Sequence, residues 1–123
     1  KKTLVSGALL RFEGQLSTFK AHQHAGDGMR YPCYRCIFPA PPPRGLIPSC
    51  AEGGVLGSVA GTIGTMQATE VIKEILGVGE SLAGWLIIMD ALNATFRKVR
   101  VKADPACALC GAQATIHDLA HHG

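Results

Sequence analysis

Cysteine is the residue type with the clearest chemical signature in this sequence. Four of the five cysteines form two Cys-x-x-Cys pairs, Cys33 with Cys36 and Cys107 with Cys110. A Cys-x-x-Cys turn points two sulfur atoms at one ion from a short stretch of backbone, and zinc takes four thiolates tetrahedrally. The spacing therefore predicts a closed zinc site that ties together parts of the chain about seventy residues apart.

Two other interpretations of the paired cysteines stay open. Either pair could be a dithiol that never meets the other, or a redox-active Cys-x-x-Cys motif. The redox interpretation is the weaker of the two, because neither pair lies at a strand-to-helix start of the thioredoxin type. Five histidines are further candidate ligands, although a solvated surface or tail position explains each of them more simply: His22, His24, His117, His121 and His122.

Cys50 is the odd thiol. It follows a connector with five prolines, residues 38–48, and precedes a predicted helix. The positive end of a helix macrodipole favours the thiolate, and an exposed connector is where a substrate could reach it. The alternative is that Cys50 is a small buried apolar residue. We predict Cys50 as the candidate catalytic residue.

The composition is that of one ordinary globular domain. Of the 123 residues, 47% are hydrophobic and 17% are charged, which is enough apolar material for a core and too little charge for a disordered chain. The formal net charge of +3 is scattered, whereas nucleic-acid-binding proteins gather their cations in a patch. The longest apolar stretch, 55–66, is too short to span a bilayer. No basic segment followed by an apolar one stands at the start, so we expect no signal peptide. We expect a soluble cytoplasmic protein that binds neither nucleic acid nor membrane.

Hydrophobic periodicity predicts the elements that must position these cysteines. Strands are expected at 3–10, 14–21, 85–90 and 95–101, and one long helix at 52–76 that Gly77 ends. The first half of that helix is rich in glycine, which lowers helix propensity. Such glycines are tolerated where another backbone packs closely against them, so we expect this helix to be deeply buried. Asp90 is expected to cap a turn, and Glu70 and Lys73 to form a solvated pair.

Several motifs, in a fixed order, resemble one enzyme family. They are SGA at 6–8, EGQ at 13–15, CYRCIFP at 33–39, CAEGGVLG at 50–57, GTIGTMQATEVIK at 61–73 and DPACALCG at 104–111. Together they resemble the C-terminal half of the MoeB/ThiF/HesA adenylyltransferases, the bacterial relatives of ubiquitin-activating enzymes. The resemblance implies an α/β fold, the C-terminal part of a Rossmann-like adenylation domain at 1–111. It would have antiparallel strands, a buried helix and a four-cysteine zinc site, with a flexible tail at 112–123.

The same resemblance implies a reaction. Such enzymes use ATP and Mg²⁺ to adenylate the C-terminal glycine of a small ubiquitin-like sulfur carrier protein, releasing pyrophosphate. The acyl-adenylate becomes a thiocarboxylate, which supplies sulfur for molybdopterin or for the thiamin thiazole. The implied partners are this carrier, a second copy in a homodimer, and a sulfurtransferase or cysteine desulfurase.

The resemblance also implies roles for the cysteines. The family's structural zinc ligands match Cys33, Cys36, Cys107 and Cys110 one for one. Cys50 matches the cysteine that can form a covalent link with the carrier.

Members of the family carry a glycine-rich nucleotide loop in their N-terminal half, and no such loop stands before Lys1 in this sequence. The glycine-rich segment 53–64 does not follow a strand, as a loop that cradles phosphates must. We therefore expect ATP and Mg²⁺ to bind the parent enzyme and not these residues alone. The alternative function is a zinc-stabilised interaction module without chemistry of its own, which binds the carrier or a partner subunit.

Overall fold

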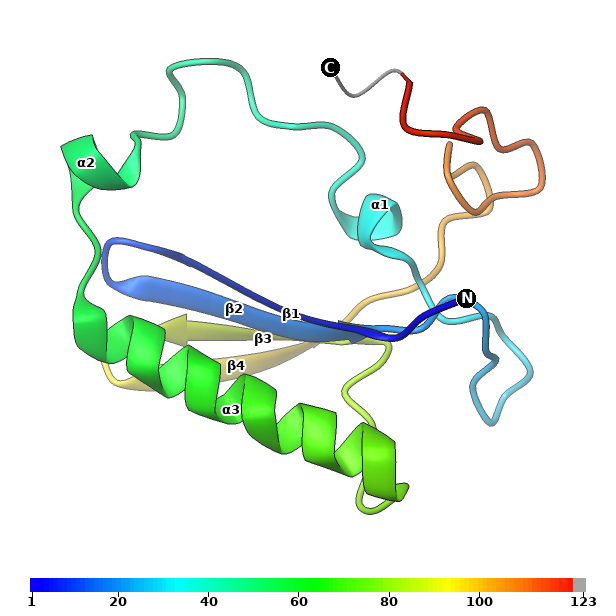
Figure 1. Ribbon diagram of the computed structural model, residues 1–123, viewed down its shortest axis with the longest axis horizontal. Coiled ribbons are helices and arrows are strands. Elements are labelled where there is room, and N and C mark those ends of the chain that lie inside the picture. Colours follow the sequence, from blue (N-terminus) through cyan, green and yellow to red (C-terminus); the bar gives the residue numbers. More distant parts are fainter. Residues whose placement is uncertain (121–123) are drawn as a thin grey trace.

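The four segments predicted as strands form one antiparallel sheet. In the computed structural model, which describes residues 1–120, the strands lie in chain order (Figure 1). They are β1 (Leu4–Leu10), β2 (Glu13–Phe19), β3 (Trp85–Asp90) and β4 (Thr95–Arg100). The predicted antiparallel architecture is confirmed, and each predicted strand lies within two residues of its observed bounds.

Both hairpins turn on a residue with positive φ. Arg11 (φ 54°) turns β1 into β2, and Ala94 (φ 51°) precedes β4. In the second turn the Asp90 carboxylate accepts hydrogen bonds from the backbone N–H groups of Leu92 and Asn93, at 3.0 and 3.2 Å. This confirms the predicted turn-capping role of Asp90.

The long excursion between β2 and β3 holds all three helices, α1 (Tyr34–Ile37), α2 (Cys50–Gly53) and α3 (Gly57–Leu76). Helix α3 crosses one face of the sheet and packs on β1 and β2 (Figure 1). Its buried residues, Val59 and Ile63, form the core with Met89. No helix within residues 1–120 has the length and apolar character that a membrane crossing requires.

Glycines in the sheet let α3 approach closely. A Cβ atom on Gly14 would lie 2.6 Å from Cγ1 of Ile63, and one on Gly7 would lie 2.8 Å from its Cγ2. Both distances are shorter than a van der Waals contact, so larger residues at either position would push the helix away. The glycines that permit a close backbone approach therefore lie in β1 and β2.

The predicted continuous helix at 52–76 is wrong in its first part. A capping box of Ser49 and Glu52 starts α2, and Gly54, at φ 71°, ends it. The next residues are extended, because the N–H of Leu56 donates to the carbonyl oxygen of Arg11 at 3.0 Å. Helix α3 begins only after this contact with the first hairpin.

The predicted deep burial of this helix is confirmed for one face only. Only Val59 and Ile63 are buried among its twenty residues. The glycines of α3 face open space: a Cβ atom on Gly57, Gly61 or Gly64 would meet no neighbour within 4 Å. The expectation that a second backbone packs against them is therefore wrong within residues 1–120.

Ion pairs hold the second half of α3. Lys20 Nζ lies 3.0 Å from one carboxylate oxygen of Glu74, and the other oxygen accepts a hydrogen bond from the Ser81 hydroxyl. The predicted Glu70–Lys73 pair forms at 2.8 Å, but it is not solvated as predicted, because the two side chains are only 13% and 24% exposed. Gly77, in the left-handed conformation, caps the helix as predicted.

Replacing Glu74 with glutamine should make the domain less stable at neutral pH. Burial raises the pKa of Glu74, but hydrogen bonds from Ser81 and Lys20 outweigh it and hold the pKa below its ordinary value of 4.5. A carboxylate whose pKa is lower in the folded than in the unfolded state stabilises the folded protein at pH values above the unfolded-state pKa. This stabilisation is lost as the pH falls through the folded-state pKa. Because the side chain is partly exposed, we expect a loss of about 1 kcal/mol at pH 7.

Urea unfolding of wild type and Glu74→Gln at pH 7 and at pH 3 measures this contribution. The difference between the two proteins should shrink at the lower pH. Glu80→Gln is the matched control, because Glu80 is exposed and takes part in no ion pair among residues 1–120. A Glu74→Gln difference that is the same at both pH values would contradict the assignment.

Candidate metal centre and the fifth cysteine

The two cysteine pairs meet beyond one end of the sheet. Cys33 is the N-cap of α1 and Cys36 lies within it, while Cys107 and Cys110 lie in a turn after β4. The sulfur of Cys33 is 3.6 Å from that of Cys107, and the sulfur of Cys36 is 3.4 Å from that of Cys110. All four sulfur atoms lie within 4.8 Å of one another. The interpretation in which the two pairs never meet is thereby excluded.

The spacing of the sulfur atoms fits a tetrahedral metal ion. Zinc–sulfur bonds of about 2.3 Å place neighbouring sulfurs about 3.8 Å apart. The Cys33–Cys36 distance is 3.8 Å, and the Cys33–Cys107 and Cys36–Cys110 distances are slightly shorter. A disulfide needs about 2.05 Å between sulfurs, and all five cysteines are free thiols. The four cysteines could therefore hold one metal ion.

Backbone hydrogen bonds shape each Cys-x-x-Cys turn. The N–H of Cys36 donates to the carbonyl oxygen of Cys33 at 3.1 Å. The N–H of Gly111 donates to the carbonyl oxygen of Cys107 at 2.9 Å. A Cβ atom on Gly111 would lie 2.6 Å from the carbonyl oxygen of Cys107, so only glycine fits there. The N–H of Asp104 donates to the Cys36 sulfur at 3.3 Å. The roles of Asp104 and Gly111 were not predicted, although a glycine directly after a Cys-x-x-Cys pair is a usable signal.

The surroundings of the thiols differ between the two pairs. Burial raises the pKa of the Cys33 and Cys36 thiols. Burial also raises that of Cys107, but the N–H groups of Cys110 and Leu109 donate to its sulfur and bring the pKa down to about 7. Because thiolates are the metal-binding form, metal uptake must release protons here and weaken in acid.

Aromatic contacts anchor α1, and with it the first cysteine pair, to the sheet. The ring of Tyr34 meets Phe19, at the end of β2, edge-on with 5.6 Å between centroids, and packs on Phe38 at 5.0 Å. The second pair follows β4, and the connector leaves α1 directly after the first pair (Figure 1). The cluster therefore joins the start of the connector to the segment after β4.

Cys50 lies far from this cluster. It is exposed and is the first residue of α2, at the other end of the connector from α1 (Figure 1). The Ser49 hydroxyl accepts a hydrogen bond from the N–H of Glu52, whose carboxylate accepts one from the N–H of Ser49. The predicted helix after Cys50 is thus only four residues long, so its macrodipole is much smaller than that of the predicted long helix.

The histidines of residues 1–120 stay outside the cluster, which contains cysteines alone. His22 lies beside the Gln23 side chain, and the backbone of His24 pairs with that of Arg30. The candidate ligands His121 and His122 lie outside the described residues.

Two known proteins are similar to nearly the whole chain. Over 118 residues the chain is 47% identical to a sulfur carrier protein adenylyltransferase of Thermus thermophilus, covering 96% of this chain and 43% of that protein. It is 49% identical over 119 residues to the adenylyltransferase and sulfurtransferase MOCS3 of Bos taurus, covering 96% of this chain and 25% of that protein. The chain thus spans less than half the length of these relatives.

A solved structure supports the fold. The crystal structure of E. coli MccB matches with a TM-score of 0.67 at 15% identity, over 98% of this chain and 36% of that one. The model of the ThiF family matches residues 1–109, which include the sheet, the three helices, Cys50 and three of the four clustered cysteines. The resemblance found in the sequence motifs is therefore confirmed, and the chain belongs to the ThiF family.

Proposed function

We propose that this chain forms part of an ATP-dependent adenylyltransferase that activates the C-terminal glycine of a ubiquitin-like sulfur carrier protein. The observation that carries the proposal is the 47% identity, over nearly the whole chain, to a sulfur carrier protein adenylyltransferase. In this reaction the glycine carboxylate attacks the α-phosphorus of ATP and pyrophosphate leaves. The acyl-adenylate then becomes the thiocarboxylate that serves molybdopterin or thiamin thiazole synthesis in the cytoplasm. ATP and Mg²⁺ are expected to bind the parent enzyme outside these residues.

Residues 1–111 are the proposed unit, in which Cys33, Cys36, Cys107 and Cys110 bind one structural zinc ion. Four thiolates leave no open coordination position, so such a site contributes folding energy rather than a reacting group. Its proposed effect is to hold the first residues of the connector against the segment after β4. The connector can then move at its Cys50 end while its other end stays fixed.

Cys50 is the proposed point of covalent contact with the carrier. Its thiolate would attack the carbonyl carbon of the carrier's acyl-adenylate, forming a thioester as AMP leaves. The exposure of Cys50 and its position at the end of a proline-rich connector support this role. A sulfurtransferase or cysteine desulfurase is the proposed source of the sulfur that enters later.

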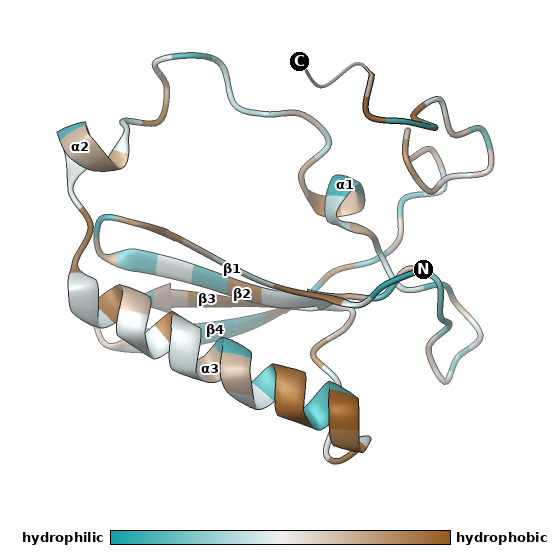
Figure 2. Ribbon diagram, in the orientation of Figure 1, coloured by the Kyte–Doolittle hydropathy of each residue, from teal (hydrophilic) through white to brown (hydrophobic). Residues whose placement is uncertain are grey.

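A homodimer is the proposed assembly. The outer face of α3 is apolar toward its C-terminal end, where Figure 2 shows hydrophobic residues on the ribbon. Ile72, Ile75 and Leu76 are 54%, 76% and 65% exposed. Exposed apolar side chains gathered on one helix face are typical of an interaction surface.

A carrier-binding and conjugation experiment tests the proposal. Sedimentation velocity should show a dimer of the chain alone and a larger complex when a ubiquitin-like sulfur carrier is added. With carrier adenylate made by the Thermus thermophilus relative, wild type should form a thiol-sensitive conjugate and Cys50→Ser should form none.

Each result has a distinct meaning. Failure of the chain to bind the carrier would sink the carrier-activation proposal, and a monomer at all concentrations would remove the homodimer. Binding without any conjugate in wild type would favour the zinc-stabilised interaction module over a covalent role for Cys50.

A further inference from the structure

One edge of the sheet carries a row of cations. Strand β4 is the last strand of the sheet, and no strand pairs with its outer side within residues 1–120. All six of its residues are exposed. The segment 95–102, which is β4 and the two residues after it, holds no Asp or Glu but four cations: Arg97, Lys98, Arg100 and Lys102. This edge is therefore an open strand with a strong local positive charge.

Protection of the edge does not by itself explain these cations. Charged side chains commonly keep an exposed strand edge from pairing with other chains. The strand at the opposite edge, β1, has no charged residue between Leu4 and Leu10. The two edges therefore differ in charge although neither has a strand partner within residues 1–120.

Two of the cations gather on one aromatic ring. In the ladder with β3, Arg100 lies opposite Trp85, and Lys98 comes two residues earlier on β4. Residues two positions apart along a strand share a face. Lys98 Nζ lies 4.7 Å from the centroid of the Trp85 ring, and Cζ of Arg100 lies 5.1 Å from it. Like charges at one ring repel each other, so a carboxylate that approaches both would relieve the repulsion.

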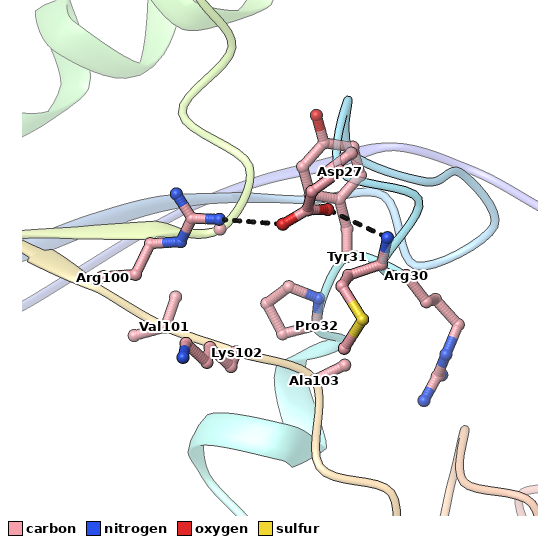
Figure 3. A pocket seen from close by; sticks show the side chains of 11 residues that line it. Asp27, Arg30, Tyr31, Pro32, Arg100, Val101, Lys102 and Ala103 are labelled. Carbon is pink, nitrogen blue, oxygen red and sulfur yellow. Dashed lines mark hydrogen bonds and ion pairs between the residues drawn. The ribbon is translucent and has the colours of Figure 1, made fainter.

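Arg100 is the one cation of this row with an acidic partner within residues 1–120. Its guanidinium lies 3.9 Å from the Asp27 carboxylate, beside a cavity of about 120 Å³ that Lys102 also lines (Figure 3). The two side chains of this pair are 49% and 55% exposed, so the pair is weak. No ion pair of the described residues includes Arg97, Lys98 or Lys102. Most of the positive charge on this edge is therefore free to meet carboxylates of another molecule.

We propose that the outer edge of β4 binds an extended, acidic segment of a partner protein. The segment adds as a further strand, and its backbone groups pair with those of β4. Because the side chains of a strand alternate between its faces, acidic residues at every second position of the segment meet Lys98 and Arg100. The site lies outside α2 and the cysteine cluster. The inference therefore goes beyond the proposed adenylyltransferase function and does not rest on it.

An extended polypeptide fits this edge better than a nucleic acid does. The open side of β4 presents backbone N–H and C=O groups, and another strand satisfies both kinds of group. A nucleic acid backbone lacks this alternation of donors and acceptors. The charge of the row favours an acidic chain, and its position on a strand edge favours a polypeptide.

Binding of short designed peptides to the 123-residue chain tests this docking site. The probe is a peptide in which threonine alternates with glutamate, and the same peptide with lysine in place of glutamate is its control. Only the acidic peptide should bind, with amide NMR shifts centred on 95–100. Trp85 is the only tryptophan, so its fluorescence should change along the same binding curve. Added salt should weaken the binding, because the pairs that form are exposed.

Reversing two charges separates charge recognition from a general loss of structure. Lys98→Glu/Lys102→Glu should bind the acidic peptide about 10-fold more weakly or less, because attraction becomes repulsion at two positions. The same variant should now bind the basic peptide. Lys2→Glu/Arg44→Glu is the matched control, because it changes the net charge equally at exposed residues outside β4. It should bind the acidic peptide as wild type does.

The inference is overturned if wild type binds both peptides equally or binds neither, or if the amide shifts lie outside β4. Binding of neither would leave the cations with protection of the edge as their role. A single-stranded oligothymidine that binds more tightly than the acidic peptide and shifts the same amides would assign this edge to nucleic acid instead.

Discussion

Replacing either Cys33 or Cys107 with serine is expected to abolish stoichiometric metal binding and to lower the free energy of unfolding by about 4 kcal/mol. That value corresponds to zinc present at roughly 1,000 times its dissociation constant, since a ligand that binds only the folded state stabilises it by mass action. The two residues come from different pairs, but their sulfur atoms are only 3.6 Å apart. Loss of either one should therefore open the same site.

Zinc content by atomic emission and urea unfolding of the purified chain measure this effect. Wild type should hold one zinc per chain, and removal by a chelator should reproduce the instability of the variants. Cys50→Ser is the matched control, because the Cys50 thiol is exposed and lies outside the cluster. Wild type that folds reduced and without metal would contradict the site and return the paired thiols to redox candidates.

Truncating Ile63 to alanine should have the second large effect, a loss of about 2–5 kcal/mol in the free energy of unfolding. Ile63 is 1% exposed and lies between α3 and the first hairpin. The backbone at Gly7 and Gly14 is already close, so the sheet has little room to close the cavity. Ile47→Ala, at a connector residue that is 50% exposed, is the control and should cost less than about 0.5 kcal/mol.

A double-mutant cycle with Gly14 tests whether Ile63 and the sheet glycine form one packing unit. Gly14→Ala alone should destabilise by roughly 1–3 kcal/mol, because its methyl group would overlap Ile63. In the Ile63→Ala background the methyl group can occupy the vacated space, so that cost should largely vanish. Urea unfolding of the four proteins gives the coupling energy, and strictly additive losses would refute the packing argument.

Local signals in the sequence were sufficient to predict the sheet strands and the turn at Asp90. Alternating apolar residues and the turn at Asp90 act over a few residues, so they retain their meaning without knowledge of the fold. The Cys-x-x-Cys pairs were equally readable, because ligand type and spacing within a knuckle are local properties. Cys50 could be singled out as the odd thiol for the same reason.

The tertiary structure alone decided how far the long helix reaches and which face it covers. The interruption before α3 depends on a hydrogen bond between Leu56 and Arg11, which are far apart in the sequence. The glycines of α3 were expected to pack against another backbone, but they point outward. The glycines that allow close packing lie in the sheet, where they accommodate Ile63.

The meeting of the two cysteine pairs depends on the same kind of contact. The clustered sulfurs come from residues 74 positions apart in the sequence. The sequence by itself determined the ligand types and the strands, because both rest on neighbouring residues. Only the packed chain decided what faces the sulfur atoms and the two sides of α3, because those neighbours come from distant segments.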